Sequence, residues 1–264
     1  MIVVTAASGA LGRLVVERLS ARTEVVAAVR DLSRAPAGVA VRHGDYDDPA
    51  GLAAAFDGAD EVLLISSPEL DAATRVAQHR NAIAAARQAG VGAIAYTSFL
   101  GADTTATGLT EAHHATEQAL RDSGVPHTLL RNPFYSDAFV PTIVDGELTA
   151  STGGRGLNTA FRADLADAAV AVLLDDGHIG QTYDLTGPLW THREVAEALG
   201  VVYREVPDDG PGPVRWLNAQ VRAGALERQT PDLERVLGRA PRTMAEHLRA
   251  RQFGEMRLTS GPNG

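Results

Sequence analysis

The sequence predicts an α/β fold built on a doubly wound parallel sheet. Short apolar segments, rich in β-branched residues, alternate with helical patterns from the first residues onward. This alternation is typical of parallel strands joined by crossover helices. The first apolar segment runs into a glycine-containing turn, residues 4–14 (VTAASGALGRL), which opens the first helical pattern. With 264 residues, of which 45% are hydrophobic, the chain is long enough for one such domain and a small additional lobe.

Each element follows from a local pattern. Apolar runs predict strands at residues 2–5, 24–29, 39–42, 61–65, 93–97, 127–131 and 181–185. Helical spacing predicts helices at residues 11–19, 49–56, 71–89, 110–122 and 164–174. Pro49 suits a first helical turn, while Gly90 and Gly124 stand where helices are expected to end.

These elements predict one domain over residues 1–187 and a smaller substrate-binding lobe, residues 188–264, packed on it. Residues 206–216 (VPDDGPGPVRW) are rich in proline and glycine and are expected to form a loop or lid over that lobe. Doubly wound sheets bind ligands at the carboxyl ends of their strands. The segments expected at that edge are residues 5–9, Arg30, 66–68, 97–99 and 132–135.

Composition excludes several classes of function. The net charge of −9 argues against nucleic-acid binding, and the absence of cysteine excludes disulfides and thiolate metal sites. No apolar run reaches about 18 residues, so we expect no membrane span and interpret the chain as a cytoplasmic monomer or homodimer. All 24 basic residues are arginines, so a mechanism that needs a lysine ammonium is excluded. No metal site is expected, because the adjacent His113 and His114 lack ligand spacing.

The turn after the first strand indicates a dinucleotide site of the Rossmann type. Gly9 and Gly12 lie between a strand and a periodic helix, where helix amides and the helix dipole favour a pyrophosphate. Ala6 occupies the tight-turn position, where glycine is usual; a Cβ is harmful there if the backbone needs a positive φ or touches the ligand. Two interpretations stay open: a tolerated variant, or a Rossmann-like shell that has lost its cofactor.

Charged residues after the second and third strands indicate which dinucleotide is bound. Arg30 ends the second strand, where an arginine suits the 2′-phosphate of NADP, and Arg34 could assist it. Asp31 is either the ribose-binding acid of an NAD site or a helix cap. Asp45, in HGDYDD, is placed to accept from an adenine amino group, or serves the turn itself. We predict NADPH, and the alternative for Arg30 is a solvated strand end.

Five longer stretches carry a family resemblance: residues 63–69 (LLISSPE), 78–104, 122–137 (DSGVPHTLLRNPFYSD), 162–173 (RADLADAAVAVL) and 237–250. They resemble the NmrA-like, atypical short-chain dehydrogenase/reductase family, and within it the bacterial NAD(P)H:quinone oxidoreductases of the quinone oxidoreductase 2 type. The resemblance implies cofactor contacts from the first turn, Arg30, Ser66, Ser67, residues 132–137 and the stretch 159–162. Together, the predicted cofactor contacts are Ala6, Ala7, Ser8, Gly9, Ala10, Leu11, Arg30, Asp45, Ser66, Ser67, Thr97, Asn132, Pro133, Phe134 and Tyr135.

The catalytic pair of typical short-chain dehydrogenases is missing. These enzymes carry a tyrosine four residues before a lysine that lowers its pKa, whereas this chain has His113 and Glu117 at those places. Three candidates remain, each with an alternative. His113 is a proton donor or an ordinary helix residue. Ser98 binds a carbonyl oxygen or satisfies the strand end, and Tyr135 donates a proton or packs its ring against the pocket. Arg131 is interpreted as the partner of a helix end or a carboxylate.

The predicted function is NADPH-dependent transfer of a hydride to a quinone or aromatic carbonyl compound. Quinones accept hydride readily, so orientation matters more than a strong acid, which agrees with the missing pair. One alternative is a reductase or isomerase of another aromatic or polycyclic metabolite. Another is a redox sensor that binds dinucleotide and a partner protein without turnover.

Overall fold

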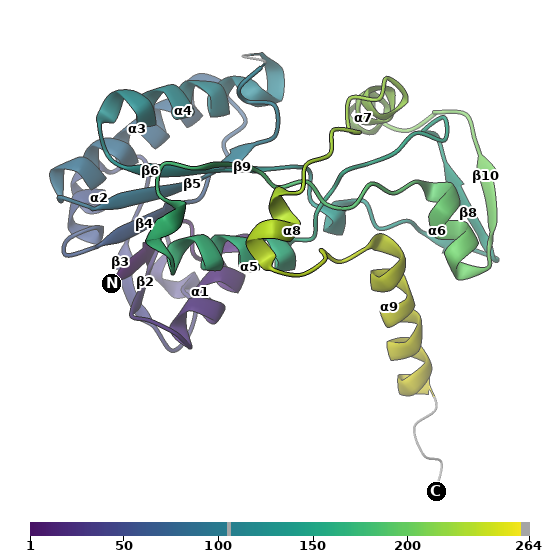
Figure 1. The fold of residues 1–264 in the computed structure, drawn as a ribbon, viewed down its shortest axis with the longest axis horizontal. Coiled ribbons are helices and arrows are strands. Elements are labelled where there is room, and N and C mark those ends of the chain that lie inside the picture. Colours follow the sequence, from purple (N-terminus) through teal and green to yellow (C-terminus); the bar gives the residue numbers. More distant parts are fainter. Residues whose placement is uncertain (105–106, 260–264) are drawn as a thin grey trace, which may run out of the picture. The chain divides into compact units, whose positions relative to one another are not determined.

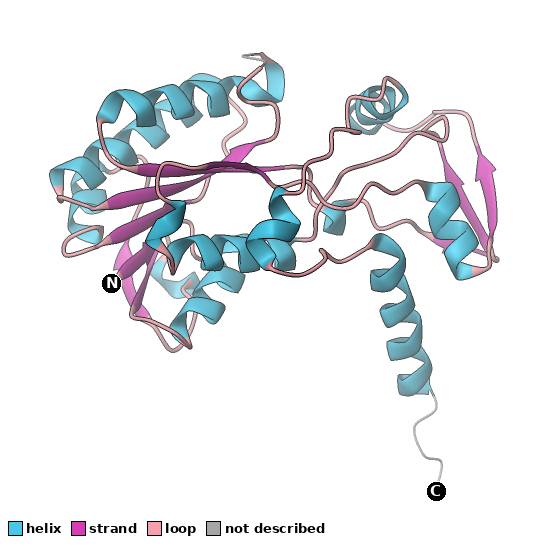
Figure 2. Ribbon diagram, in the orientation of Figure 1, coloured by secondary structure: helices cyan, strands magenta, loops and turns pink. Residues whose placement is uncertain are grey.

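The computed structural model describes residues 1–104 and 107–259, with side chains described up to Arg251 (Figures 1 and 2). Two compact units are present. The first contains Met1–Asn132, Arg162–Leu185 and Asp232–Gly238; the second contains Pro133–Phe161, Thr186–Pro231 and the chain from Arg239 onward. The sequence-based division after residue 187 stays a prediction, and the compact units differ from it by placing residues 133–161 in the second unit.

The first unit is built on a seven-stranded sheet in the order β3-β2-β1-β4-β5-β6-β9. All its neighbouring strands pair in parallel. The strands are β1 Ile2–Val4, β2 Val25–Val29, β3 Ala40–His43, β4 Glu61–Leu64, β5 Ala93–Phe99, β6 His127–Asn132 and β9 Thr182–Asp184. Strand order reverses between β1 and β4, so ligands are expected at the carboxyl ends of these two strands. The predicted doubly wound fold is confirmed.

Helices cover both faces of this sheet (Figure 1). They are α1 Ala10–Ser20, α2 Pro49–Ala55, α3 Ala72–Gln88, α4 Glu111–Ser123, α5 Arg162–Leu173 and α8 Asp232–Leu237. Helices α2, α3 and α4 pack side by side on one face, and α1, α5 and α8 on the other. The Asp48 and Asp71 carboxylates cap α2 and α3, and Gly124, at a φ of 74°, ends α4.

The core under α2–α4 comes from alternate strand residues, because successive side chains of a strand point to opposite faces of the sheet. Val3, Val62 and Ile94 belong to it, and Tyr96 is its largest fully buried side chain. Short 3₁₀ turns complete the first unit at η1 Leu32–Arg34, η2 Gly108–Thr110 and η4 Asp176–His178. Within residues 1–104 and 107–259, no helix has both the length and the apolar character that crossing a bilayer requires.

The second unit has a three-stranded sheet in the order β10-β8-β7, in which β8 pairs in parallel with β10 and antiparallel with β7. Its elements are η3 Ser136–Ala138, β7 Ile143–Val144, β8 Glu147–Ala150, α6 His192–Leu199, β10 Val202–Glu205, α7 Gly212–Arg222 and α9 Met244–Thr259. Leu148, Leu157 and Trp190 form its core with residues of α6, α7 and α9.

The expectation of a loop over residues 206–216 is wrong in its second half. Helix α7 begins at Gly212 and includes Trp216. Pro213 lies in the first turn of this helix, where its missing N–H needs no partner and its fixed φ already suits a helix. The proline that indicated a loop therefore starts a helix.

Candidate cofactor and active site

The turn after β1 has the strained conformation that a glycine usually provides. Ala6 takes a φ of +46°, in the left-handed region that L-residues with a Cβ adopt at a cost. The amide of Gly9 donates to the Ala6 carbonyl at 2.9 Å and closes the turn, while the Ala7 amide donates to the Ala28 carbonyl of β2 at 3.2 Å. Glycine would adopt this conformation at position 6 without that cost.

Helix α1 starts in direct contact with this turn. A Cβ at Gly12 would lie 2.6 Å from the Ala6 carbonyl oxygen and 2.8 Å from the Ala7 Cα, so only glycine fits without displacing backbone. No side chain caps the helix at Gly9, and helix N-termini leave amides without intrahelical partners. Exposed Gly9 and Ala10 at such a terminus fit the pyrophosphate of a dinucleotide.

We expect Ala6→Gly to raise the free energy of unfolding by about 0.5–1 kcal/mol. The left-handed conformation costs alanine roughly 1–2 kcal/mol, and the larger entropy loss of glycine offsets part of that gain. Denaturant titration measures the change. Ala10→Gly, a matched control at the exposed first residue of α1, should be neutral or destabilising. A loss of stability in Ala6→Gly would contradict the backbone conformation described here.

Arginines gather at the carboxyl end of β2. Arg30 is exposed directly after the strand. Arg13, on α1, donates from Nε to the Ser8 carbonyl at 3.0 Å and from its guanidinium to the Arg34 carbonyl, so it joins the loops after β1 and β2. Arg13 was not predicted from the sequence, although a basic residue directly after Gly12 was a signal. A phosphate at this edge would lie near the exposed Arg30.

Asp31 and Asp45, each given two interpretations, both take part in local turns. Asp31 accepts from the Ser33 amide at 3.0 Å and the Ser33 hydroxyl at 2.7 Å, capping η1. These hydrogen bonds lower the pKa of Asp31. Asp45 accepts from the Asp47 amide at 3.1 Å, a side-chain turn of the kind that aspartate favours. The structure thus supports the cap for Asp31 and gives Asp45 a turn role compatible with an adenine contact.

The loops after β1 and β4 are joined to each other and to β5 by buried hydroxyls. Thr5 accepts from the Ile65 amide and donates to the Leu63 carbonyl, each at 2.9 Å. Thr97 Oγ1 accepts from the Ser66 amide at 2.9 Å. The Tyr46 hydroxyl lies 2.6 Å from Thr5 Oγ1. The strand ends at the switch point are therefore fixed to one another by side chains.

Ser98, Glu117 and Arg131 form a buried polar cluster between β5, α4 and β6. Ser98 Oγ donates to Glu117 Oε1 at 2.7 Å. The Arg131 guanidinium binds both Glu117 oxygens, at 2.8 and 2.7 Å, and Asp103 and Asp184 lie 3.2 and 3.6 Å from its Nη1. The single hydroxyl proton of Ser98 is thus donated to Glu117. This favours the interpretation in which Ser98 serves a hydrogen bond inside the protein at the strand end.

His113 is buried beside Tyr96. Its Nδ1 lies 2.9 Å from the Tyr96 hydroxyl, and its residue is 7% exposed. Burial, assisted by the charge of Arg75 and opposed by that of Glu117, lowers the pKa of His113 to about 4. The imidazole is therefore neutral at pH 7 and holds no imidazolium proton to donate, which favours its interpretation as a helix residue.

The residues that follow β6 pair with the stretch 159–162, the other segment for which the family resemblance implies cofactor contacts. Asn132 ends β6, and its carbonyl accepts from the Leu100 amide at 2.9 Å. In the second unit, Pro133 leads into Phe134 and Tyr135, and Tyr135 forms a parallel bridge with Ala160. The Phe134 carbonyl accepts from the Ala160 amide at 3.2 Å. The two implied contact stretches, 132–137 and 159–162, are thus brought together.

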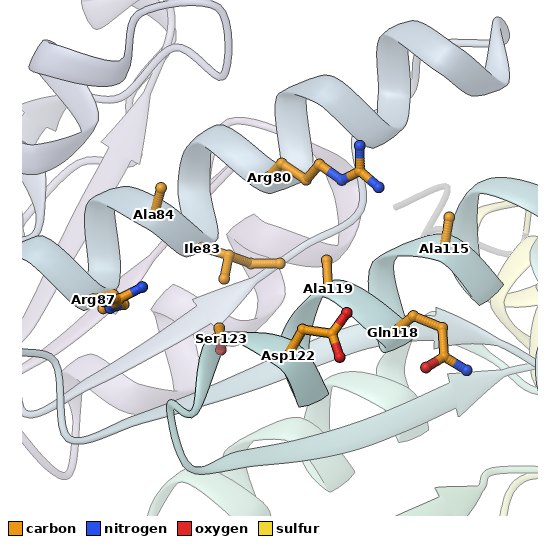
Figure 3. Close-up of a pocket in the computed structure, with 9 residues that line it drawn as sticks. All are labelled: Arg80, Ile83, Ala84, Arg87, Ala115, Gln118, Ala119, Asp122 and Ser123. Carbon is orange, nitrogen blue, oxygen red and sulfur yellow. The ribbon is translucent and has the colours of Figure 1, made fainter.

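A surface groove between α3 and α4 does not coincide with these residues (Figure 3). It is lined by Arg80, Ile83, Ala84, Arg87, Ala115, Gln118, Ala119, Asp122 and Ser123. None of the predicted cofactor or catalytic residues lines it. The candidate site is therefore the strand-end edge and not this groove.

Comparison with known proteins assigns the chain to a protein family. Residues 6–176 match the NAD(P)H-binding family. Quinone oxidoreductase 2 of Escherichia coli (strain K12) is 42% identical over 211 residues, which are 75% of this chain and 73% of that protein. The chain belongs to this family. The predicted resemblance is confirmed, and the protein is an NAD(P)H-dependent oxidoreductase.

Solved structures of family members agree over nearly the whole chain. The NADPH complex of the Escherichia coli NADPH-dependent quinone oxidoreductase superposes with a TM-score of 0.84 at 35% identity, covering 96% of this chain and 100% of that one. Citrobacter triphenylmethane reductase complexed with NADP(H) gives 0.86 at 31% identity, covering 95% and 99%. This NAD(P)H-binding oxidoreductase therefore shares its fold with a quinone oxidoreductase and a triphenylmethane reductase.

Proposed function

We propose that the protein is an NADPH-dependent reductase that transfers a hydride to a quinone. One observation carries the proposal: α4 holds no tyrosine–lysine pair, and the side chains at those two places are engaged inside the protein. His113 contacts Tyr96, and Glu117 binds Arg131 and Ser98. A substrate that accepts hydride without an activated acid suits such a site. The name of the Escherichia coli relative supports the same acceptor.

Each part of the site has a proposed role. The bound cofactor supplies the hydride. The amides at the start of α1 bind its pyrophosphate, and Arg30, with Arg13 holding the neighbouring loops, binds its 2′-phosphate. Phe134 and Tyr135 are proposed to line the nicotinamide pocket. Tyr135 then contributes mainly through its ring, which orients a flat acceptor and keeps water away from it.

Turnover with a panel of acceptors tests this proposal. Oxidation of NADPH is followed at its absorbance band with benzoquinones, naphthoquinones, an azo compound and a triphenylmethane dye. We expect the quinones to be reduced fastest. Reduction of only the dye or the azo compound would favour another aromatic acceptor, and NADPH binding without any turnover would favour a redox sensor.

We expect Arg30→Ala to weaken NADPH binding at least tenfold and to leave NADH binding nearly unchanged. A charge-assisted guanidinium–phosphate contact contributes about 1.5–3 kcal/mol, and NADH lacks the phosphate. Titration calorimetry with both cofactors measures the effect. Arg22→Ala removes another exposed arginine, which lies between α1 and the start of β2 and not at the carboxyl end of β2. This control should change neither affinity. Equal affinities of the unmodified protein for NADPH and NADH would remove this role from Arg30.

A further inference from the structure

A fully buried histidine lies beneath the loop that follows β4. His79, on α3, is 0% exposed. Its ring meets those of Tyr46 and Tyr96 edge-on, with centroids 6.1 and 5.5 Å away. The roles proposed above do not use it, although it contacts the loop that carries Ser66 and Ser67. Buried polar groups are normally hydrogen-bonded, and the partners of His79 lie on the loop after β4 and on α4.

The hydrogen bonds define which nitrogen of His79 carries the proton. Thr116 Oγ1 lies 2.7 Å from the Ala112 carbonyl and must donate its only hydrogen there. Thr116 Oγ1 is also 2.8 Å from His79 Nδ1, so it accepts a hydrogen from that nitrogen. On the other side of the ring, the Ser67 amide donates to His79 Nε2 at 2.9 Å. Both contacts require a neutral ring protonated at Nδ1.

The environment of His79 keeps the ring in that state. Burial, with smaller contributions from His113 and Arg75, lowers the pKa of His79 to about 3. Nε2 therefore remains an acceptor for the Ser67 amide throughout the neutral range. The link from Thr116 of α4 through His79 to the loop therefore does not depend on pH in that range.

The preceding residue fixes the same loop from a second direction. Ser67 Oγ donates to Gln78 Oε1 at 2.5 Å. The Gln78 amide nitrogen donates to both carboxylate oxygens of Asp47, at 3.1 and 3.0 Å. Gln78 thereby joins the loop after β4 to the loop after β3, which also holds Asp45.

These contacts attach the loop to α3 and to β5. The Ser67 amide and hydroxyl hydrogens both go to α3, and the Ser66 amide goes to Thr97. The backbone N–H groups of Ser66 and Ser67 thus both point into the protein interior. The internal hydrogen bonds therefore set the position of the loop atoms that a ligand would contact.

We propose that His79, together with Gln78, is a positioning residue for cofactor binding: it holds the loop after β4 in the conformation that receives NADPH. This inference rests on the proposed NADPH-dependent function. A buried hydrogen-bond network that is fully satisfied specifies one arrangement, and pre-organised loops bind more tightly because less ordering occurs on binding.

The test compares two substitutions at His79. His79→Gln keeps an acceptor for the Ser67 amide and a donor for Thr116, whereas His79→Leu fills similar space without either. We expect the Kd for NADPH to rise about tenfold in His79→Leu and to stay within about threefold of the unmodified protein in His79→Gln. Titrations are made well below the unfolding midpoint of each variant, so that a change in global stability alone would not alter the Kd.

A second readout is independent of the cofactor. Exchange of the Ser67 amide hydrogen, followed by NMR in the free protein, should be slow in the unmodified protein and His79→Gln, and at least tenfold faster in His79→Leu. Faster exchange with an unchanged Kd would overturn the positioning role, and unchanged exchange would overturn the contact itself. If the unmodified protein does not bind NADPH at all, the proposed function fails, an outcome distinct from failure at His79.

Discussion

Glu117→Ala should lower the free energy of unfolding by about 3–5 kcal/mol, the cost typical of removing one partner from a buried ion pair. The Glu117 side chain is 1% exposed and that of Arg131 is 8% exposed. Without the carboxylate, the guanidinium keeps Asp103 and Asp184 as its acidic partners among the described residues, neither closer than 3.2 Å, and the Ser98 hydroxyl loses its acceptor. Denaturant titration and thermal melting measure the loss.

The control removes a glutamate from the same helix. Glu111 is exposed in the first turn of α4, where a carboxylate interacts with the helix dipole for less than about 1 kcal/mol. Glu111→Ala should therefore change stability little. If both variants lost the same amount, the cluster around Arg131 would contribute no more than a surface charge does, and our account of it would be wrong.

The contribution of Glu117 should also depend on pH. Burial opposes its ionisation, but hydrogen bonds from Arg131 and Ser98 and the charges of Arg131 and Arg121 outweigh burial and hold its pKa below the ordinary value. A lowered carboxyl pKa stabilises the folded state above the unfolded value of about 4.3 and stops doing so as pH falls through the folded value. The stability difference between the unmodified protein and Glu117→Gln should therefore shrink in acid.

Much of the fold was predictable because its signals are local. The seven strands of the first sheet are short apolar runs, and each was expected within a few residues of its observed place. Caps and stops were equally local: Pro49 begins α2, and Gly124 ends α4. The end of β2 was found in the same way, because Arg30 follows directly on an apolar strand.

The second unit was less predictable because its organisation is not local. β8 pairs with β10, which lies more than fifty residues later in the chain, and neither strand is strongly apolar. Residues 133–161 leave the first unit after β6 and the chain returns at Arg162. Nothing in the composition of that stretch distinguishes a long excursion from an ordinary crossover.

The candidate site shows the same limit. Glu117 was noticed only as the residue in place of a lysine, and Arg131 only as the partner of some helix end or carboxylate. Their bidentate contact joins α4 to β6, and the sequence pattern does not pair residues across elements. His79 likewise looks like one more residue of an alanine-rich helix until its contacts with Ser67 and Thr116 are known.

Gly12→Ala should destabilise the protein and weaken NADPH binding together, whereas Gly9→Ala should weaken binding alone. At Gly12, a Cβ would lie 2.6 and 2.8 Å from backbone atoms of Ala6 and Ala7, which cannot rotate away. Overpacking against such atoms costs about 3 kcal/mol, and the better helix propensity of alanine returns only about 1 kcal/mol. The net loss should be about 2 kcal/mol, and α1 should move off the turn.

Gly9 provides the matched comparison within the same turn. Its φ of −76° and ψ of 166° are open to alanine. A Cβ there would lie 3.2 Å from the Ala6 carbonyl oxygen, a tight contact that a shift of a few tenths of an ångström relieves, whereas two of the contacts at Gly12 are shorter than 3.0 Å. The free energy of unfolding of Gly9→Ala should therefore lie within about 0.5 kcal/mol of that of the unmodified protein, as is usual for surface substitutions. Its Cβ would project where we propose the pyrophosphate approaches, so the Kd for NADPH should rise at least tenfold. Unfolding curves and NADPH titrations of both variants decide the matter: unchanged NADPH binding by Gly9→Ala would mean that the phosphates do not lie against this turn.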